Sequence, residues 1–232
     1  MQDVSETRLT FKAATLRRDS LQQQIYDNLR SDIMTGVFRP GETLSSRSLA
    51  TELGVSAMPV REALTRLTTE GALELTTSRT LRLRLLTPED FDEITAIRTD
   101  LEGMAAERAA EQITGDSLAR IGKLNDDLTA AADSGDADRY LKANATYHAE
   151  IYKISGWPLL LSMIERLWLI VGPSIRTCVP DRDHMATSQG FHDAVMTALT
   201  KGDAKAVRAA IVDDIQTAAH DIRAFLASGE KH

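Results

Sequence analysis

The segment between Gly36 and Gly71 constrains the fold more than any other part of this chain. Residues 46–53 and 58–70 each repeat apolar side chains at helical spacing, and the turn Gly54-Val55-Ser56 lies between them. Glycine tolerates a positive φ angle, and Ser56 can cap the second helix. Two short helices joined in this way form a helix-turn-helix, a unit that places its second helix in the major groove of DNA.

The second helix of this unit, residues 58–70, is the candidate recognition helix. Its spacing predicts one buried face, made of Val60, Ala63, Leu64 and Leu67. The candidates for contacting DNA are Ser56 at its start and Arg61, Thr65 and Arg66 on its exposed face. An alternative role for Arg61 is a surface salt bridge to a nearby carboxylate.

The flanking segments complete a winged domain. Upstream, apolar residues recur every four positions and predict a helix from about Leu16 to Thr35, ended by Gly36. Thr43-Leu44 can form a short strand. Downstream, leucines alternate with charged residues through residues 73–85, which predicts two strands joined by a turn at residues 77–80. This turn is the wing tip, where Arg79 would meet the DNA backbone or minor groove.

Residues 16–86 resemble the N-terminal domain of the GntR family of transcription regulators. The resemblance rests on a Gly-x3-Pro-Gly turn and on the string Val-Ser-x-x-Pro-Val-Arg-Glu-Ala-Leu-x2-Leu-x2-Glu-Gly. It implies that Arg47 and Arg61 contact the operator. This chain has Ala57 where the family usually has arginine, and Thr80 where the wing usually has glycine. We therefore expect its operator sequence or affinity to differ from those of its relatives.

The remainder of the chain predicts only helices. Thr87-Pro88-Glu89-Asp90 has the composition of a helix start, with a capping residue, a proline and two carboxylates. Six helices are expected, at about 88–112, 115–134, 138–155, 158–177, 185–200 and 204–227. The predicted fold is therefore mainly α, with a polar tail at residues 1–15, a winged helix-turn-helix at 16–86 and an antiparallel helical bundle at 87–228.

Several strings in the bundle resemble the FCD ligand-binding domain of the FadR subgroup of GntR regulators. They are Arg98-x2-Leu101-Glu102, Asn144-x2-Tyr147-His148 with Ser155-Gly156-Trp157-Pro158, and His192 before Ala198-Leu199-x2-Gly202-Asp203. Many FCD domains bind a metal through an aspartate and three histidines, and the resemblance implies that the ligands here are Asn144, His148, His192 and Asp214. Two imidazoles and a carboxylate suit a divalent transition metal, zinc first, with nickel or another metal as alternatives.

The same resemblance implies an effector site beside the metal. Arg98 would hold the carboxylate of a small organic acid, because a guanidinium can bind that group with two hydrogen bonds. Each assignment has a plainer alternative. Arg98 could pair with Glu102 one turn away, Tyr147 could pack in the core instead of lining the cavity, and each histidine could be a hydrogen-bonded core residue. Asp214 could belong to a solvated face with Asp213.

Charge and cysteine content restrict the function further. Residues 1–86 contain 12 Lys and Arg against 10 Asp and Glu, whereas the remainder contains 15 against 24. Such an acidic chain is a poor non-specific polyanion binder, so we expect a small, specific DNA contact made by a homodimer. The single cysteine, Cys178, fits a reducing cytoplasm. No uninterrupted apolar stretch has the length of a membrane span.

These features favour a metabolite-responsive transcription regulator, a repressor that binds a palindromic operator as a dimer. A metal-dependent helical-bundle enzyme is the first alternative, but the paired Glu-x-x-His motifs of di-iron bundles and a nucleophile–base pair are missing from the sequence. A DNA-binding architectural protein without an effector is the second alternative.

Overall fold

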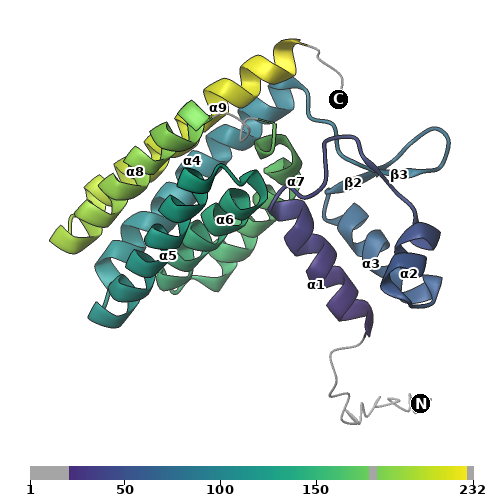
Figure 1. Ribbon diagram of the computed structural model, residues 1–232, viewed down its shortest axis with the longest axis horizontal. Helices are drawn as coiled ribbons and strands as arrows, with labels where there is room; N and C mark the ends of the chain where they lie inside the picture. Colours follow the sequence, from purple (N-terminus) through teal and green to yellow (C-terminus); the bar gives the residue numbers. More distant parts are fainter. Residues whose placement is uncertain (1–20, 178–181, 229–232) are drawn as a thin grey trace, which may run out of the picture.

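The computed structural model describes residues 21–177 and 182–228, which contain nine α-helices and three short strands. The predicted tail at residues 1–15, the start of the predicted first helix and Cys178 lie outside the described residues. The helices form two groups: α1 to α3 lie beside a small sheet, and the longer helices α4 to α9 lie together in a bundle (Figure 1). The predicted mainly α fold, with a winged helix-turn-helix followed by a helical bundle, is confirmed.

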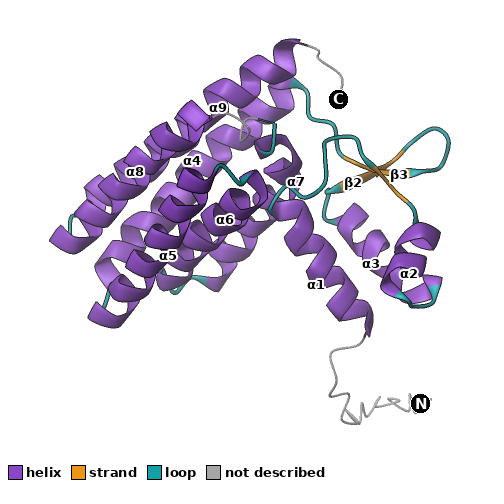
Figure 2. Ribbon diagram, in the orientation of Figure 1, coloured by secondary structure: helices purple, strands orange, loops and turns teal. Residues whose placement is uncertain are grey.

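The N-terminal group is a winged helix-turn-helix. Its elements are α1 (Leu21–Met34), β1 (Thr43–Leu44), α2 (Ser46–Leu53), α3 (Ala57–Thr69), β2 (Leu73–Leu75) and β3 (Leu81–Leu83). The strands form an antiparallel sheet in the order β1-β3-β2 (Figure 2). Gly54 adopts a φ of +65° and ends α2 by donating its N–H to the carbonyls of Ala50 and Thr51. Ser56 occupies the N-cap position of α3, but its hydroxyl makes no capping hydrogen bond.

The buried face of α3 agrees with the prediction. Val60, Ala63, Leu64 and Leu67 are buried, and they pack against α1 and the sheet. Because this face is fixed in the core, the opposite face of α3 is turned to solvent.

The C-terminal group is an antiparallel bundle. Its helices are α4 (Pro88–Gln112), α5 (Gly115–Ser134), α6 (Ala137–Ile154), α7 (Pro158–Ile175), α8 (Arg182–Lys201) and α9 (Ala204–Ser228). Thr87 caps α4 by accepting from the Asp90 N–H, as its sequence predicts. Helices α4, α6, α5, α8 and α9 contact one another in that circular order, so their inward faces enclose a common core.

Helix α7 joins the two groups. Over 18 residues its mean hydropathy is 1.4, so by length and composition it could cross a membrane, but the fold uses it as a core helix. Ile164 and Trp168 pack into the bundle core, whereas Leu169 packs into the core of the winged domain. At Gly172 the backbones of α7 and α1 approach so closely that a Cβ would lie 2.4 Å from the carbonyl oxygen of Ile33. The sequence predicts a helix at 158–177 but does not indicate that it links the two domains.

Candidate metal site, effector cavity and DNA-binding surface

A small buried cavity lies in the bundle. Its volume is about 40 Å³, and its walls come from α4, α6, α7, α8 and α9. The polar or aromatic residues in these walls are Phe91, Arg98, Glu102, Tyr140, Asn144, His148, Trp168, Ser188 and Asp214. A cavity of this size has room for about three water molecules at most. In this conformation it therefore suits an ion rather than an organic acid of several carbon atoms.

His148 and Asp214, two of the four predicted metal ligands, line this cavity, and His192 lies beside them. His148 Nε2 lies 3.3 Å from Asp214 Oδ2, His192 Nε2 lies 3.6 Å from the same oxygen, and the two Nε2 atoms are 3.3 Å apart. The three side chains come from α6, α8 and α9, and all are buried. Two ligands of a tetrahedral zinc ion with bonds of about 2.0–2.1 Å lie about 3.3 Å apart. The spacing of these donor atoms thus matches such an ion without rearrangement.

Asn144, the fourth predicted ligand, lies one turn before His148 on α6 and lines the same cavity. Its Oδ1 atom is buried without a hydrogen-bond partner among the described residues. A buried polar atom without a partner is costly, so an unpaired oxygen beside two imidazoles and a carboxylate fits a cation ligand. The residues present therefore fit a divalent metal, with an amide oxygen where the family more often has a carboxylate.

Asp214 is fixed on both of its oxygens. Ser188 Oγ donates to Oδ1 at 2.7 Å, which turns Oδ2 toward the two histidines. Burial alone would raise the pKa of Asp214, but while the two histidines are protonated, the positive charge on His192 and hydrogen bonds from both histidines outweigh burial and hold this pKa well below its usual value. Asp214 is thus an ionised carboxylate in the core. It does not lie on a solvated face, which was the alternative.

Arg98 makes the pair with Glu102 that was the alternative to its predicted role at the effector site. It lines the cavity, and its Nε donates to Glu102 Oε1 at 2.7 Å, with both side chains buried. The other carboxylate oxygen of Glu102 accepts from the Tyr152 hydroxyl at 2.7 Å, and that hydroxyl lies 3.2 Å from His148 Nδ1. Burial and the neighbouring Glu102 raise the pKa of Tyr152 well above its ordinary value, so it keeps its proton.

Tyr147 lies elsewhere than expected. It is fully buried, is not among the residues that line the cavity, and donates its hydroxyl to the carbonyl oxygen of His192 at 3.2 Å. Its ring also contacts the His192 ring edge-on. Tyr147 therefore supports a ligand, whereas Trp168 lines the cavity.

The sequence reasoning missed Tyr152 and Ser188 as parts of the site. A signal for Tyr152 was present, because Tyr140, Asn144, His148 and Tyr152 recur every four residues and form one stripe along α6. Extending the Asn144–His148 pair by one turn would have found it. Ser188 carried no such signal, since only the packing of α8 against α9 brings it to Asp214.

The predicted DNA-contacting residues are all exposed. Arg47 on α2 and Arg61 on α3 are exposed, and so is Ser56 at the start of α3. Thr65 is exposed too, although its hydroxyl donates to the Arg61 carbonyl one turn earlier. Arg79 lies in the turn between β2 and β3 with a φ of +60°, so the left-handed residue of this wing is Arg79 and not its neighbour Thr80.

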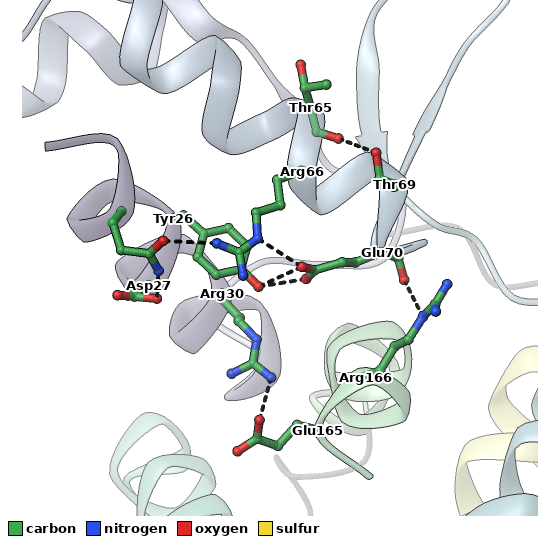
Figure 3. A network of polar contacts seen from close by, with 10 residues as sticks. Tyr26, Asp27, Arg30, Thr65, Arg66, Thr69, Glu70, Glu165 and Arg166 are labelled. Atoms are coloured by element: carbon green, nitrogen blue, oxygen red, sulfur yellow. Dashed lines mark hydrogen bonds and ion pairs between the residues drawn. The ribbon is translucent and has the colours of Figure 1, made fainter. Parts of the chain in front are cut away.

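Arg66 points in a different direction. Its guanidinium lies over the Tyr26 ring at 3.6 Å, its Nε contacts Glu70 Oε1 at 3.1 Å, and Nη1 donates to Gln23 Oε1 at 3.0 Å (Figure 3). Expected on the DNA-facing side, it instead extends toward α1 and the junction with α7. There Arg30 Nη2 pairs with Glu165 of α7 at 2.9 Å.

Comparison with known proteins agrees with this geometry. Residues 21–81 match the family described as bacterial regulatory proteins, gntR family, and residues 93–217 match the FCD domain. The chain belongs to the GntR family. This regulator is 34% identical over 160 residues to the HTH-type transcriptional regulator McbR of Escherichia coli K12. The matched region covers 69% of this chain and 72% of McbR. It is 26% identical over 206 residues to the transcriptional repressor RspR of the same organism, covering 88% of this chain and 89% of RspR.

A solved structure supports the arrangement of the domains. The structure of E. coli McbR/YncC superimposes on this GntR regulator with a TM-score of 0.82 and 30% identity, over 90% of this chain and 98% of the other. The matched domains and relatives are transcriptional regulators. The chain is thus a DNA-binding transcriptional regulator and not the metal-dependent enzyme considered as an alternative.

Proposed function

We propose that this GntR regulator is a cytoplasmic repressor that binds a palindromic operator as a homodimer and responds to a small organic acid bound beside a divalent metal. The observation that carries the proposal is the convergence of His148, His192 and Asp214 beside a cavity that Arg98 also lines. Zinc is the first choice for the metal, with nickel or another transition metal as alternatives.

The DNA contact is proposed to centre on Arg61, with Arg47, Ser56, Thr65 and Arg79 around it. Arg61 lies on the exposed face of α3, where an arginine can bind a base edge or a phosphate in the major groove. The structure favours a lesser role for Arg66, because its guanidinium is held by Tyr26, Gln23 and Glu70.

Two copies of this small winged domain would supply the specific affinity. A single domain of this kind contacts one half-site, and a symmetric dimer reads two half-sites about one helical turn apart. Light scattering of the purified protein should give the mass of two chains, and with operator DNA it should give the mass of two chains plus one duplex. A monomer under both conditions would contradict the dimer.

The effector is proposed to act by widening the cavity. An organic acid does not fit into about 40 Å³, so its entry has to move a wall, and Trp168 of α7 is one of the walls. Helix α7 also carries Glu165 and Gly172, which contact α1 of the winged domain. A ligand that favours one position of α7 would thereby favour one position of the DNA-binding domain, which is the physical requirement for coupling between the two sites.

The experiment has two steps. Purified protein first selects its operator from a random duplex library, and fluorescence anisotropy at fixed salt then measures the affinity. Organic acids are next screened by thermal shift with and without Zn²⁺, and each acid that stabilises the protein is added to the DNA titration. An acid that weakens operator binding supports the proposal, and a promoter that overlaps the operator should be less active when the protein is present.

Other outcomes separate the alternatives. Failure to enrich any sequence would contradict the DNA-binding assignment. Specific DNA binding that no metal or organic acid alters would favour the effector-independent architectural protein.

A further inference from the structure

A buried chain of hydrogen bonds connects Arg98 to His148. Arg98 Nε donates to Glu102 Oε1 at 2.7 Å, the Tyr152 hydroxyl donates to Glu102 Oε2 at 2.7 Å, and this hydroxyl lies 3.2 Å from His148 Nδ1. Exposures are 7% for Arg98, 0% for Glu102, 1% for Tyr152 and 2% for His148, so water does not compete for these bonds. The four proposed metal ligands could bind an ion without these hydrogen bonds.

The number of available protons determines which group donates and which accepts in each of these hydrogen bonds. Glu102 pairs with a guanidinium and is an acceptor at both oxygens, so the single hydroxyl proton of Tyr152 is committed to Oε2. The Tyr152 oxygen can then only accept a hydrogen bond from His148. A neutral imidazole has one N–H, and this arrangement places it on Nδ1. The Nε2 atom of His148 is left with its lone pair, and it faces Asp214 and His192.

We propose that Tyr152 and Glu102 are positioning residues that hold His148 as the Nδ1–H tautomer, which keeps Nε2 ready to bind the metal. This inference rests on the proposed metal site and adds to it the residues that orient one ligand. Groups that accept from the second nitrogen of a metal-binding histidine fix its tautomer and ring orientation, and their loss typically weakens metal binding about 10- to 100-fold.

His192 differs from His148 in this respect. Its Nδ1 atom is buried without a hydrogen-bond partner among the described residues, so no acceptor holds a proton on that nitrogen. With His148 Nε2 unprotonated, the contact of 3.3 Å between the two Nε2 atoms requires His192 Nε2 to carry the proton. Metal binding then changes the tautomer of His192 while that of His148 stays the same. His148 thus has its metal-binding tautomer before the metal binds, whereas His192 changes its tautomer when the metal binds.

The test compares Tyr152→Phe with Tyr147→Phe. Both variants remove one buried phenolic hydroxyl from α6, but the Tyr147 hydroxyl donates to the His192 carbonyl and does not touch His148 Nδ1. The first measurement is imidazole ¹⁵N NMR of the metal-free protein at about pH 8, where an ordinary histidine is neutral. Wild type and Tyr147→Phe should show His148 protonated at Nδ1, and Tyr152→Phe should show the Nε2–H form or a mixture.

The second measurement is Zn²⁺ affinity by competition with a chromophoric chelator. Tyr152→Phe should bind about 10- to 100-fold more weakly than wild type, whereas Tyr26→Phe, which removes a buried hydroxyl of the winged domain outside the metal site, should bind as wild type does. Glu102→Gln is the second variant, because an amide no longer commits the Tyr152 proton and should give a mixture of His148 tautomers. Circular dichroism and the thermal midpoint verify that each variant is folded.

The possible failures are distinguishable. If wild type binds no metal while its His148 is protonated at Nδ1, the proposed metal site fails and the tautomer assignment stands. If His148 is protonated at Nε2 in the metal-free wild type, or if Tyr152→Phe changes neither the tautomer nor the affinity, the positioning role is overturned.

Discussion

Gly172→Ala should push α7 and α1 apart where their backbones approach closely. Gly172 lies in the last turn of α7, and a Cβ built there would lie 2.4 Å from the Ile33 carbonyl oxygen and 2.8 Å from that of Met34. Cβ atoms essentially never come within 3.0 Å of another heavy atom, so α1 and α7 have to move apart by at least 0.6 Å. Both nearest atoms belong to the backbone, and no rotamer change can relieve the clash.

The expected size follows from two opposing effects. Replacing glycine by alanine inside a helix stabilises the helix by about 0.8–1.0 kcal/mol. Overpacking a buried contact costs about 1–3 kcal/mol, and a clash with backbone belongs at the upper end of this range. The net effect should be a loss of about 1–2 kcal/mol in the free energy of unfolding. Because α7 also lines the effector cavity through Trp168, the coupling between effector and operator should weaken as well.

Gly190→Ala is the matched control. Gly190 also lies within a helix, α8, but it is exposed and a Cβ there meets nothing within 4 Å. This variant should be as stable as wild type or more stable. Urea unfolding of both variants, followed by circular dichroism, measures the difference. If Gly172→Ala is as stable as Gly190→Ala, the close contact between α1 and α7 is not a constraint, and the proposed route through α7 loses its basis.

Three further predictions concern the DNA contact, the metal and pH. Arg61→Ala should weaken operator binding by about 1–3 kcal/mol per half-site at fixed salt with the fold intact, and an unchanged gel-shift titration would contradict this role. A double variant, His148→Ala with His192→Ala, should contain no metal by elemental analysis and should lose the stabilisation that added Zn²⁺ gives to wild type. Burial and the hydrogen bond to Glu70 raise the pKa of Tyr26 to about 12. Because the unfolded pKa is about 10, this contribution to stability is fully present below pH 10 and is lost as the pH rises from 10 to 12. Tyr26→Phe should therefore lose less stability across this window than wild type, and equal losses in urea titrations would refute the assignment.

Much of the fold could be predicted because its signals are local. The turn at Gly54, the buried face of α3 and the cap at Thr87 depend on residues within one or two turns of each other. The same holds for Asn144 and His148, since a four-residue spacing puts two side chains on one helical face whatever the rest of the chain does. The placement of His192 and Asp214 beside them was implied by family resemblance, because no local pattern relates positions on separate helices.

The sequence by itself thus determined which segments are helices and strands, which faces they bury, and which residue types could bind DNA or a metal. Only the tertiary structure decided where individual side chains point. Packing of α3 on α1 turns Arg66 toward Tyr26, and the closing of the bundle around its core takes the Tyr147 hydroxyl of α6 to the His192 carbonyl of α8. Packing of α4 on α6 brings Glu102 to Tyr152, 50 residues further along the chain. A hydrogen bond between distant residues depends on how whole helices pack, and that is a property of the entire core and not of any one segment.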